Sequence, residues 1–183
     1  MKLLRPIQHV NTVPEVDIAA LTERGVKGVI IDLDNTLAEW NRNDLCPTIV
    51  QWLQELDQQG IKVCILSNNG ERRVQQFAEG CQIKVPYISR AKKPRRKGFL
   101  QAMQKLGTTA QETAVIGDQI FTDVLGGNRI GMHTILVNPI SRREFLGTRL
   151  VRTLEKIVLR RRRTLKLQKK SRKNKKDGGS AAR

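Results

Sequence analysis

The sequence predicts an α/β fold with a doubly wound parallel sheet and helices on both of its faces. Short apolar runs rich in β-branched residues alternate with amphipathic stretches over residues 1–141. Most of the amphipathic stretches end at a glycine, which is a common way for a helix to end. Because parallel strands need a crossover connection, this alternation of strand and helix predicts consecutive βαβ units.

The apolar runs predict the strands of this sheet. The first run, VKGVIIDL, is continuous, β-branched and too short for a typical helix, which is the pattern of a strand buried on both faces. Cys64 lies inside the second run and is expected to be a small core residue. The expected strands are residues 26–33, 61–66, 85–89, 113–116 and 134–137.

The amphipathic stretches predict helices over residues 47–59, 71–79 and 97–106. In the first of them, apolar residues recur at helical spacing, and Gly60 follows the last turn. Gly80 and Gly107 follow the other two stretches in the same way. We therefore expect each of these helices to connect two neighbouring strands of the sheet.

Charge divides the chain into parts of different character. The formal net charge is +17, but residues 142–183 hold 17 Lys and Arg against three acidic residues, which gives +14 and leaves +3 for residues 1–141. We expect a catalytic domain over 1–141. Residues 142–166 repeat apolar residues at three- and four-residue steps among basic ones, which predicts a basic amphipathic helix. Residues 167–183 are nearly all polar, and we expect them to be a disordered basic tail.

Several classes of protein do not fit this composition. Three widely spaced cysteines without a C-x-x-C pair do not suit a disulfide framework or a zinc site, and they fit a reducing compartment. The sequence has no run of the ~18–20 apolar residues that a membrane span needs. Residues 1–10 lack the apolar centre of a signal peptide. We expect a cytoplasmic protein that is peripheral on the inner face of a membrane.

Acidic residues follow the first expected strand. Ligands of doubly wound sheets bind beyond the carboxyl ends of the strands, so the residues there are candidates for chemistry. Asp32 and Asp34 lie two positions apart on an extended segment, which places both carboxylates on the same side. Two like charges so close require a cation, and an all-oxygen site suits Mg²⁺. Taken alone, the motif also fits a turn that caps the next segment.

Candidates for binding phosphate follow the second and third strands. Ser67 and Asn68 stand at a strand-to-helix junction, where a hydroxyl and backbone N–H groups can cradle a phosphate, although Ser67 also fits a helix N-cap. Lys93, in the motif KKP, could neutralise a phosphoryl group and a nucleophile beside it. Lys92 is the alternative, but the proline after Lys93 stiffens the backbone there and favours Lys93.

A second acidic pair follows the fourth strand in the motif GDQIFTD. Asp118 can complete an octahedral Mg²⁺ shell, and Asp123 can reach back to orient ligands or a lysine. Each of the four motifs is a modest signal by itself. Their order, with each at the carboxyl end of an expected strand, predicts one site for phosphoryl chemistry.

With DLDNT, SNN, KKP and GDQIFTD, the sequence resembles the haloacid dehalogenase superfamily, and more narrowly the YqeG-type subfamily IIIA phosphatases, over residues 3–145. The resemblance implies that Asp32 attacks phosphorus and forms an aspartyl-phosphate. It implies that Asp34 protonates the leaving oxygen and then deprotonates the attacking water. Superfamily members with an aspartate at this second position are usually phosphatases.

The resemblance also implies how this site would hold phosphate and metal. Ser67, Asn68 and Lys93 would bind the phosphoryl group. Mg²⁺ would bind Asp32, the backbone carbonyl of Asp34, and Asp118, with Asp123 behind these ligands.

The substrate is expected to be large or attached to a surface. Little chain lies between Thr36 and Ser67 beyond the expected helix, so the fold is expected to lack a cap domain over its site. YqeG-like relatives include phosphatidylglycerophosphate phosphatases, which implies a lipid-linked phosphate, with the basic residues after 141 on an anionic membrane. Two alternatives remain: a soluble phosphoester substrate, and an RNA- or ribosome-associated protein. The basic tail has no aromatic residue past Phe145 to stack on bases.

Overall fold

The computed structural model describes residues 2–39, 46–80 and 85–141. The expected amphipathic helix at 142–166 and the expected tail at 167–183 lie outside the described residues. Among the described residues, none of the helices has the length and apolar character that crossing a bilayer requires.

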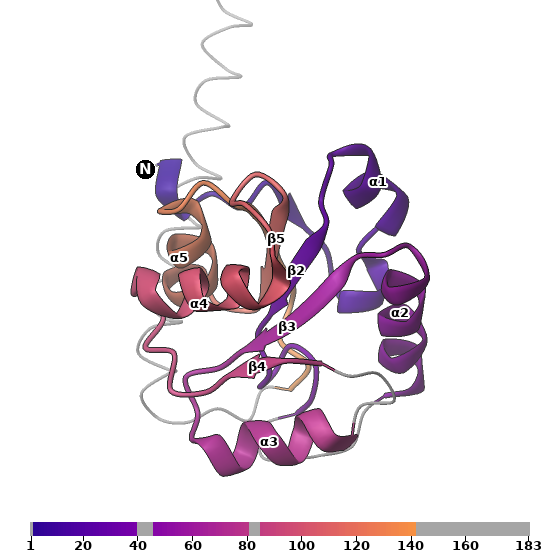
Figure 1. Cartoon of the computed structure of the whole chain (residues 1–183), viewed down its shortest axis with the longest axis vertical. Coiled ribbons are helices and arrows are strands. Elements are labelled where there is room, and N and C mark those ends of the chain that lie inside the picture. Colours follow the sequence, from indigo (N-terminus) through magenta and orange to yellow (C-terminus); the bar gives the residue numbers. More distant parts are fainter. Residues whose placement is uncertain (1, 40–45, 81–84, 142–183) are drawn as a thin grey trace, which may run out of the picture. The chain divides into compact units, whose positions relative to one another are not determined.

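The fold is built on one sheet of parallel strands, in the order β1-β6-β5-β2-β3-β4 (Figure 1). The central strand β2 pairs with β3 on one side and with β5 on the other, and Ile31 lies opposite both Ile65 and Ile116. The predicted parallel sheet is therefore confirmed. The strands are β1 (Gln8–His9), β2 (Gly28–Ile31), β3 (Lys62–Leu66), β4 (Tyr87–Ile88), β5 (Thr113–Gly117) and β6 (His133–Leu136).

Helices connect the strands and cover both faces of the sheet. The predicted helices are present as α2, α3 and α4, and Gly107 ends α4 in the left-handed conformation with a φ of 70°. Shorter turns, which the sequence did not predict, lie at Lys2–Leu4 and Val13–Glu15, and a π-helical turn spans Ile120–Val124. The α-helices are α1 (Ile18–Glu23), α2 (Pro47–Gln58), α3 (Glu71–Gly80), α4 (Arg96–Leu106) and α5 (Leu125–Asn128).

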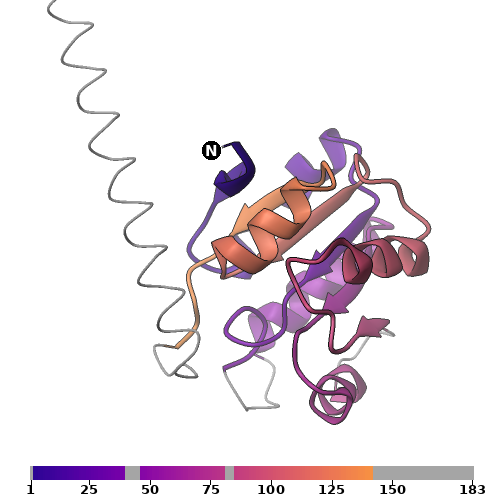
Figure 2. The same ribbon diagram turned by 90° about the vertical axis from the view of Figure 1, so that its left-hand side faces the viewer.

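The core has one layer on each face of the sheet. Ile31 belongs to the layer that α2 and α3 close, whereas its neighbour Ile30 belongs to the layer on the opposite face with Phe99 of α4. Figure 2 looks onto the side of the molecule that carries α4 and α5. All residues of β2 are buried, as the continuous apolar run predicts. Cys64 is a core residue as predicted, and burial raises the pKa of its thiol to about 12.

The chain after β6 returns to the carboxyl ends of the strands. Ile140 N donates a hydrogen bond to Asn35 O at 3.0 Å, and the Ser141 hydroxyl lies 3.2 Å from Asn35 Oδ1. The last described residues therefore lie beside the loop that follows β2. Between β2 and α3, the elements of the described residues are α2 and β3.

Candidate active site

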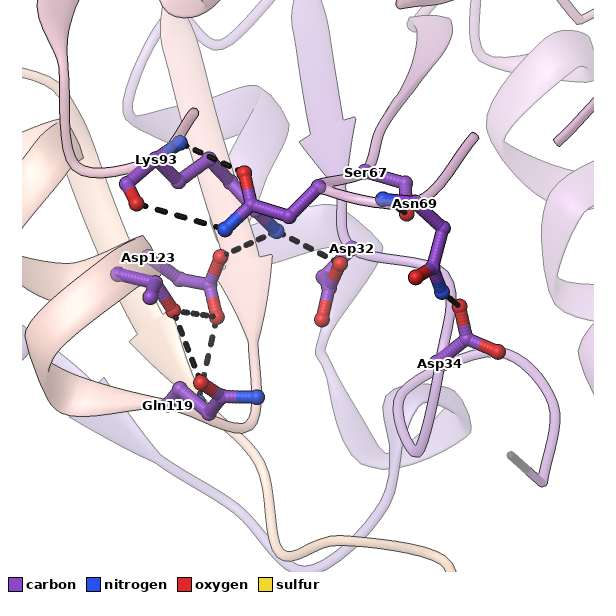
Figure 3. Close-up of polar contacts among 9 residues, drawn as sticks. Asp32, Asp34, Ser67, Asn69, Lys93, Gln119 and Asp123 are labelled. Carbon is purple, nitrogen blue, oxygen red and sulfur yellow. Dashed lines mark hydrogen bonds and ion pairs between the residues drawn. The ribbon is translucent and has the colours of Figure 1, made fainter. Parts of the chain in front are cut away.

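The predicted site residues come together at the carboxyl ends of β2, β3 and β5 (Figure 3). Asp32 directly follows β2, and its N–H donates to Ile116 O of β5 at 2.9 Å. Ser67 follows β3, Asp118 follows β5, and Lys93 lies in the loop after β4. Because the three strands are neighbours in register, residues far apart in the sequence meet at one edge of the sheet.

Lys93 is the lysine of the site. Its Nζ lies 2.6 Å from Asp32 Oδ1 and 2.7 Å from Asp123 Oδ1, and its side chain is only 3% exposed. Lys92 is exposed. Burial by itself lowers the pKa of Lys93, but the charges of Asp123 and Asp32 outweigh that effect and hold the pKa above its ordinary value. Lys93 is therefore a cation beside the proposed nucleophile.

Asn68 holds the main chain of Lys93. Its Oδ1 accepts a hydrogen bond from Lys93 N at 2.6 Å, and its Nδ2 donates to Lys93 O at 3.4 Å. Ser67 is buried, and its hydroxyl oxygen accepts from Asn69 N at 3.1 Å. Ser67 and Asn68 thus shape the turn between β3 and α3 and seat the lysine. Their contact with phosphate stays a prediction.

The Asp34 carboxylate lies apart from that of Asp32 (Figure 3). It is held by Asn69, in the loop before α3, and by Arg73, in the first turn of α3. Asn69 Nδ2 donates to Asp34 Oδ2 at 2.5 Å. Arg73 donates to Asp34 Oδ1 from Nε at 3.3 Å and from Nη2 at 3.1 Å. The sequence analysis did not single out Asn69 or Arg73. The available signal was their four-residue spacing across the junction between the loop and α3, and one more arginine has little weight in a chain of net charge +17.

Three buried carboxylates form the acidic part of the site. Asp32, Asp118 and Asp123 are 8%, 5% and 1% exposed, and each offers an oxygen atom within 4.8 Å of the others. Asp123 comes from the π-helical turn, where its Oδ2 accepts from Gln119 N and the Thr122 hydroxyl, both at 3.2 Å. The carboxylate of Asp34 is held elsewhere by Asn69 and Arg73, so the ligand predicted at that residue is its backbone carbonyl.

The charges of this cluster suit a divalent cation. When all are ionised, three carboxylates and the Lys93 ammonium group leave two negative charges in a buried space. Burial raises the pKa of Asp32 to about 7, and the nearby ammonium group of Lys93 opposes the shift. The charges of Asp123 and Asp34 add to the effect of burial on the pKa of Asp32, and the charges of Asp123 and Asp32 raise the pKa of Lys93. A hard divalent cation bound by oxygen ligands would balance this charge.

Residues 14–131 match the haloacid dehalogenase-like hydrolases. The chain belongs to this family. It is 44% identical over 158 residues to the probable phosphatase YqeG of Bacillus subtilis (strain 168), with 86% of this chain and 91% of that protein covered. The predicted membership is confirmed, as is the prediction that the chain is an enzyme of the phosphatase type found in this family.

A second relative differs in length. The chain is 31% identical over 168 residues to phosphatidylglycerophosphate phosphatase 1, chloroplastic/mitochondrial, of Arabidopsis thaliana, with 85% of this chain and 47% of that protein covered. The chain thus spans about half the length of this relative.

A solved structure shares the fold. An uncharacterized protein from Listeria monocytogenes serotype 4b superimposes with a TM-score of 0.51 at 19% identity, over 66% of this chain and 86% of that one. At this identity the likeness concerns the sheet and its helices alone.

Proposed function

We propose that the chain is a Mg²⁺-dependent phosphatase that uses Asp32 as a covalent nucleophile and converts phosphatidylglycerophosphate to phosphatidylglycerol. The observation that carries the chemistry is the buried Asp32 carboxylate, 2.6 Å from the Lys93 ammonium group and within the cluster of Asp118 and Asp123. A cation beside an anionic nucleophile reduces its repulsion from an anionic phosphate ester.

The reaction has two steps. An oxygen of Asp32 attacks phosphorus, the bond from phosphorus to the leaving oxygen breaks, and Asp34 gives its proton to that oxygen. Asp34 then takes a proton from a water molecule, whose oxygen displaces Asp32 from phosphorus and releases inorganic phosphate. Lys93 and the turn at Ser67 would bind the phosphoryl oxygens. Bound at Asp32, the backbone carbonyl of Asp34, and Asp118, Mg²⁺ would supply charge neutralisation.

Two observations support a lipid-linked substrate. The first is the similarity to the phosphatidylglycerophosphate phosphatase of Arabidopsis, together with the short connections around the site. The second is a group of exposed cations that are close to Lys93 in the sequence. Among the described residues none of these forms an ion pair. They are Lys92, Arg95, Arg96 and Lys97. Near an anionic surface each such residue is worth ~1 kcal/mol of binding.

The substrate is tested by phosphate release from phosphatidylglycerophosphate in mixed micelles containing Mg²⁺. We expect release by the wild type and none by Asp32→Asn, because the amide cannot form the aspartyl-phosphate. A soluble sugar phosphate serves as the substrate control. If both proteins leave the lipid intact while the wild type alone hydrolyses p-nitrophenyl phosphate, the chemistry stands and the lipid substrate is wrong.

We propose further that the chain acts on the inner face of an anionic membrane, to which the basic residues after 141 add affinity. We expect the full chain to sediment with vesicles containing anionic lipid, and less so when Arg160, Arg161, Arg162 and Arg163 are changed to glutamine. Tighter binding to RNA than to these vesicles at the same salt concentration would contradict the membrane assignment and favour an RNA partner.

A further inference from the structure

We propose that Arg73 and Asn69 are positioning residues for proton transfer, because together they leave one lone pair of Asp34, on Oδ2, to carry the proton toward the leaving oxygen. This inference rests on the proposed function, in which Asp34 is the general acid. It adds two residues to the reaction and assigns the atom of Asp34 that carries the proton.

The contacts of Asp34 account for its other acceptor positions. A carboxylate has about four of them, two on each oxygen. Two N–H groups of Arg73 reach Oδ1, at 3.3 and 3.1 Å, and Asn69 reaches Oδ2 at 2.5 Å. Three positions are therefore taken by donors within the described part of the chain. An arginine or amide N–H cannot accept a hydrogen bond, so the proton of Asp34 has to occupy the remaining position on Oδ2.

The fold fixes both donors before any substrate binds. The Arg73 guanidinium lies over the ring of Phe77, 5.8 Å from its centre and one turn further along α3. Phe77 is fully buried, so its ring is a fixed support. The backbone of Asn69 is held on both sides, because its N–H donates to Ser67 Oγ and its carbonyl accepts from Arg90 N at 2.8 Å.

This arrangement suits a proton that leaves in one direction. As the bond from phosphorus to the leaving oxygen breaks, its electron pair stays on that oxygen, which takes the proton from Oδ2. The negative charge that appears on Asp34 then faces the Arg73 guanidinium, and the two form a charge-assisted pair. The side chain of Arg73 is 14% exposed and that of Asp34 is 12% exposed. Proton donation by Asp34 speeds the reaction most for strongly basic leaving groups, since weakly basic ones depart without a proton.

Dependence on the leaving group tests the inference. We would measure kcat/KM for a series of aryl phosphates from phenyl to p-nitrophenyl. This quantity reports the steps up to formation of the aspartyl-phosphate, so hydrolysis of that intermediate does not enter the comparison. For Arg73→Gln we expect a loss of ~10-fold or more on phenyl phosphate, with less than ~3-fold on p-nitrophenyl phosphate, since a positioned acid contributes ~10²–10⁴-fold. Asn69→Ala is expected to show the same trend.

Matched variants separate this role from a structural one. Arg72→Gln removes an exposed arginine from the same turn of α3 and is expected to keep the wild-type dependence on the leaving group. Equal losses across the series for Arg73→Gln would overturn the inference. If Arg73→Gln does not fold, Arg73→Lys serves instead: a lysine cannot place two donors on Oδ1, so a wild-type dependence in that variant would also overturn it.

Failure of the proposed function gives a different result. If Asp34→Asn matches the wild type in kcat/KM across the series, or if the wild type hydrolyses no phosphate ester, then Asp34 is not the acid and the proposed reaction itself falls. If Asp34→Asn shows the steep dependence and both Arg73 variants do not, the reaction stands and only the positioning role is lost.

Discussion

At the scale of single residues, the site depends on one buried cation. Lys93 serves two carboxylates at once, Asp32 at 2.6 Å and Asp123 at 2.7 Å, and its main chain is clamped by Asn68. A short and fully buried ion pair of this kind loses much when one partner is removed, because the remaining charge has no compensation. The lysine therefore contributes to the fold, and under the proposed function it also contributes to the chemistry.

Lys93→Met is expected to lower kcat/KM by ~10²-fold or more, since it removes a preorganised charge from the reacting phosphate. It should also lower the free energy of unfolding by ~3–5 kcal/mol at neutral pH, because Asp32 and Asp123 stay buried without their cation. Phosphate release and urea unfolding measure the two effects. With p-nitrophenyl phosphate as the soluble substrate, Lys92→Met, at the exposed neighbour, should change neither, and comparable losses in both variants would contradict the assignment.

At the scale of elements, close approach at the end of β5 seats Asp123. A Cβ atom at Gly117 would lie 2.4 Å from the Asp123 carboxyl group, so only glycine lets the π-helical turn return so tightly to the strand. That return brings Asp123 beside Lys93. Asp118 and Asp123 are five residues apart in the sequence, but they lie in one cluster because the π-helical turn between β5 and α5 is compact.

A second link between elements depends on pH. Glu112 stands just before β5 and pairs with Lys27, just before β2, at 2.5 Å. The hydrogen bond from Lys27, with those from Thr109, lowers the pKa of Glu112 to about 2. A pKa that is lower in the folded state means that the ionised carboxylate stabilises the fold above its ordinary pKa of 4.5. This contribution is lost as the pH falls from that value toward 2.

Glu112→Gln is therefore expected to be less stable than the wild type at pH 7, and the difference should shrink as the pH falls through this range. Urea midpoints at a series of pH values provide the measurement. Glu23→Gln, on α1, removes an exposed carboxylate elsewhere in the fold and is a suitable control. If the difference in urea midpoint between Glu112→Gln and the wild type is the same at every pH from 7 down to about 2, the charge of Glu112 is not its source.

At the scale of the whole molecule, the sheet gathers more negative charge than it neutralises. Strand ends that are far apart in the sequence bring Asp32, Asp118 and Asp123 together, and Lys93 balances one of the three charges. The folded state therefore creates a cluster of buried carboxylates that the unfolded chain lacks, and we expect a divalent cation to bind there only in the folded state. A ligand that binds only the folded state raises its stability by mass action.

Removing metal should lower both activity and thermal stability. We expect chelation with EDTA to abolish phosphate release, and added Mg²⁺ to restore it and to raise the melting temperature. In Asp118→Asn the rise on adding Mg²⁺ should be much smaller, because one buried carboxylate is lost. A melting temperature that does not respond to Mg²⁺ in the wild type would count against a metal site in this cluster.

The sequence by itself determined the sheet and the residues at its edge. Strands that are buried on both faces have continuous apolar sequences, so the apolar runs at residues 26–33 and 61–66 predict such strands. The strands β2 and β3 lie within these runs. Parallel strands place their carboxyl ends together, so Asp32, Ser67, Lys93 and Asp118 could be assigned to one site from their position after each strand. Local pattern was sufficient for these predictions.

Only the tertiary structure decided which side chains contact one another. The two-residue edge strand β1 is too short to show a pattern, and it exists because β6 offers an unpaired edge. The Lys93 contact with Asp32, the clamp by Asn68 and the Arg73 contact with Asp34 join residues 25 to 61 positions apart. Such contacts depend on the packing of α3 and of the loop after β4 against the sheet, and no short-range periodicity encodes them.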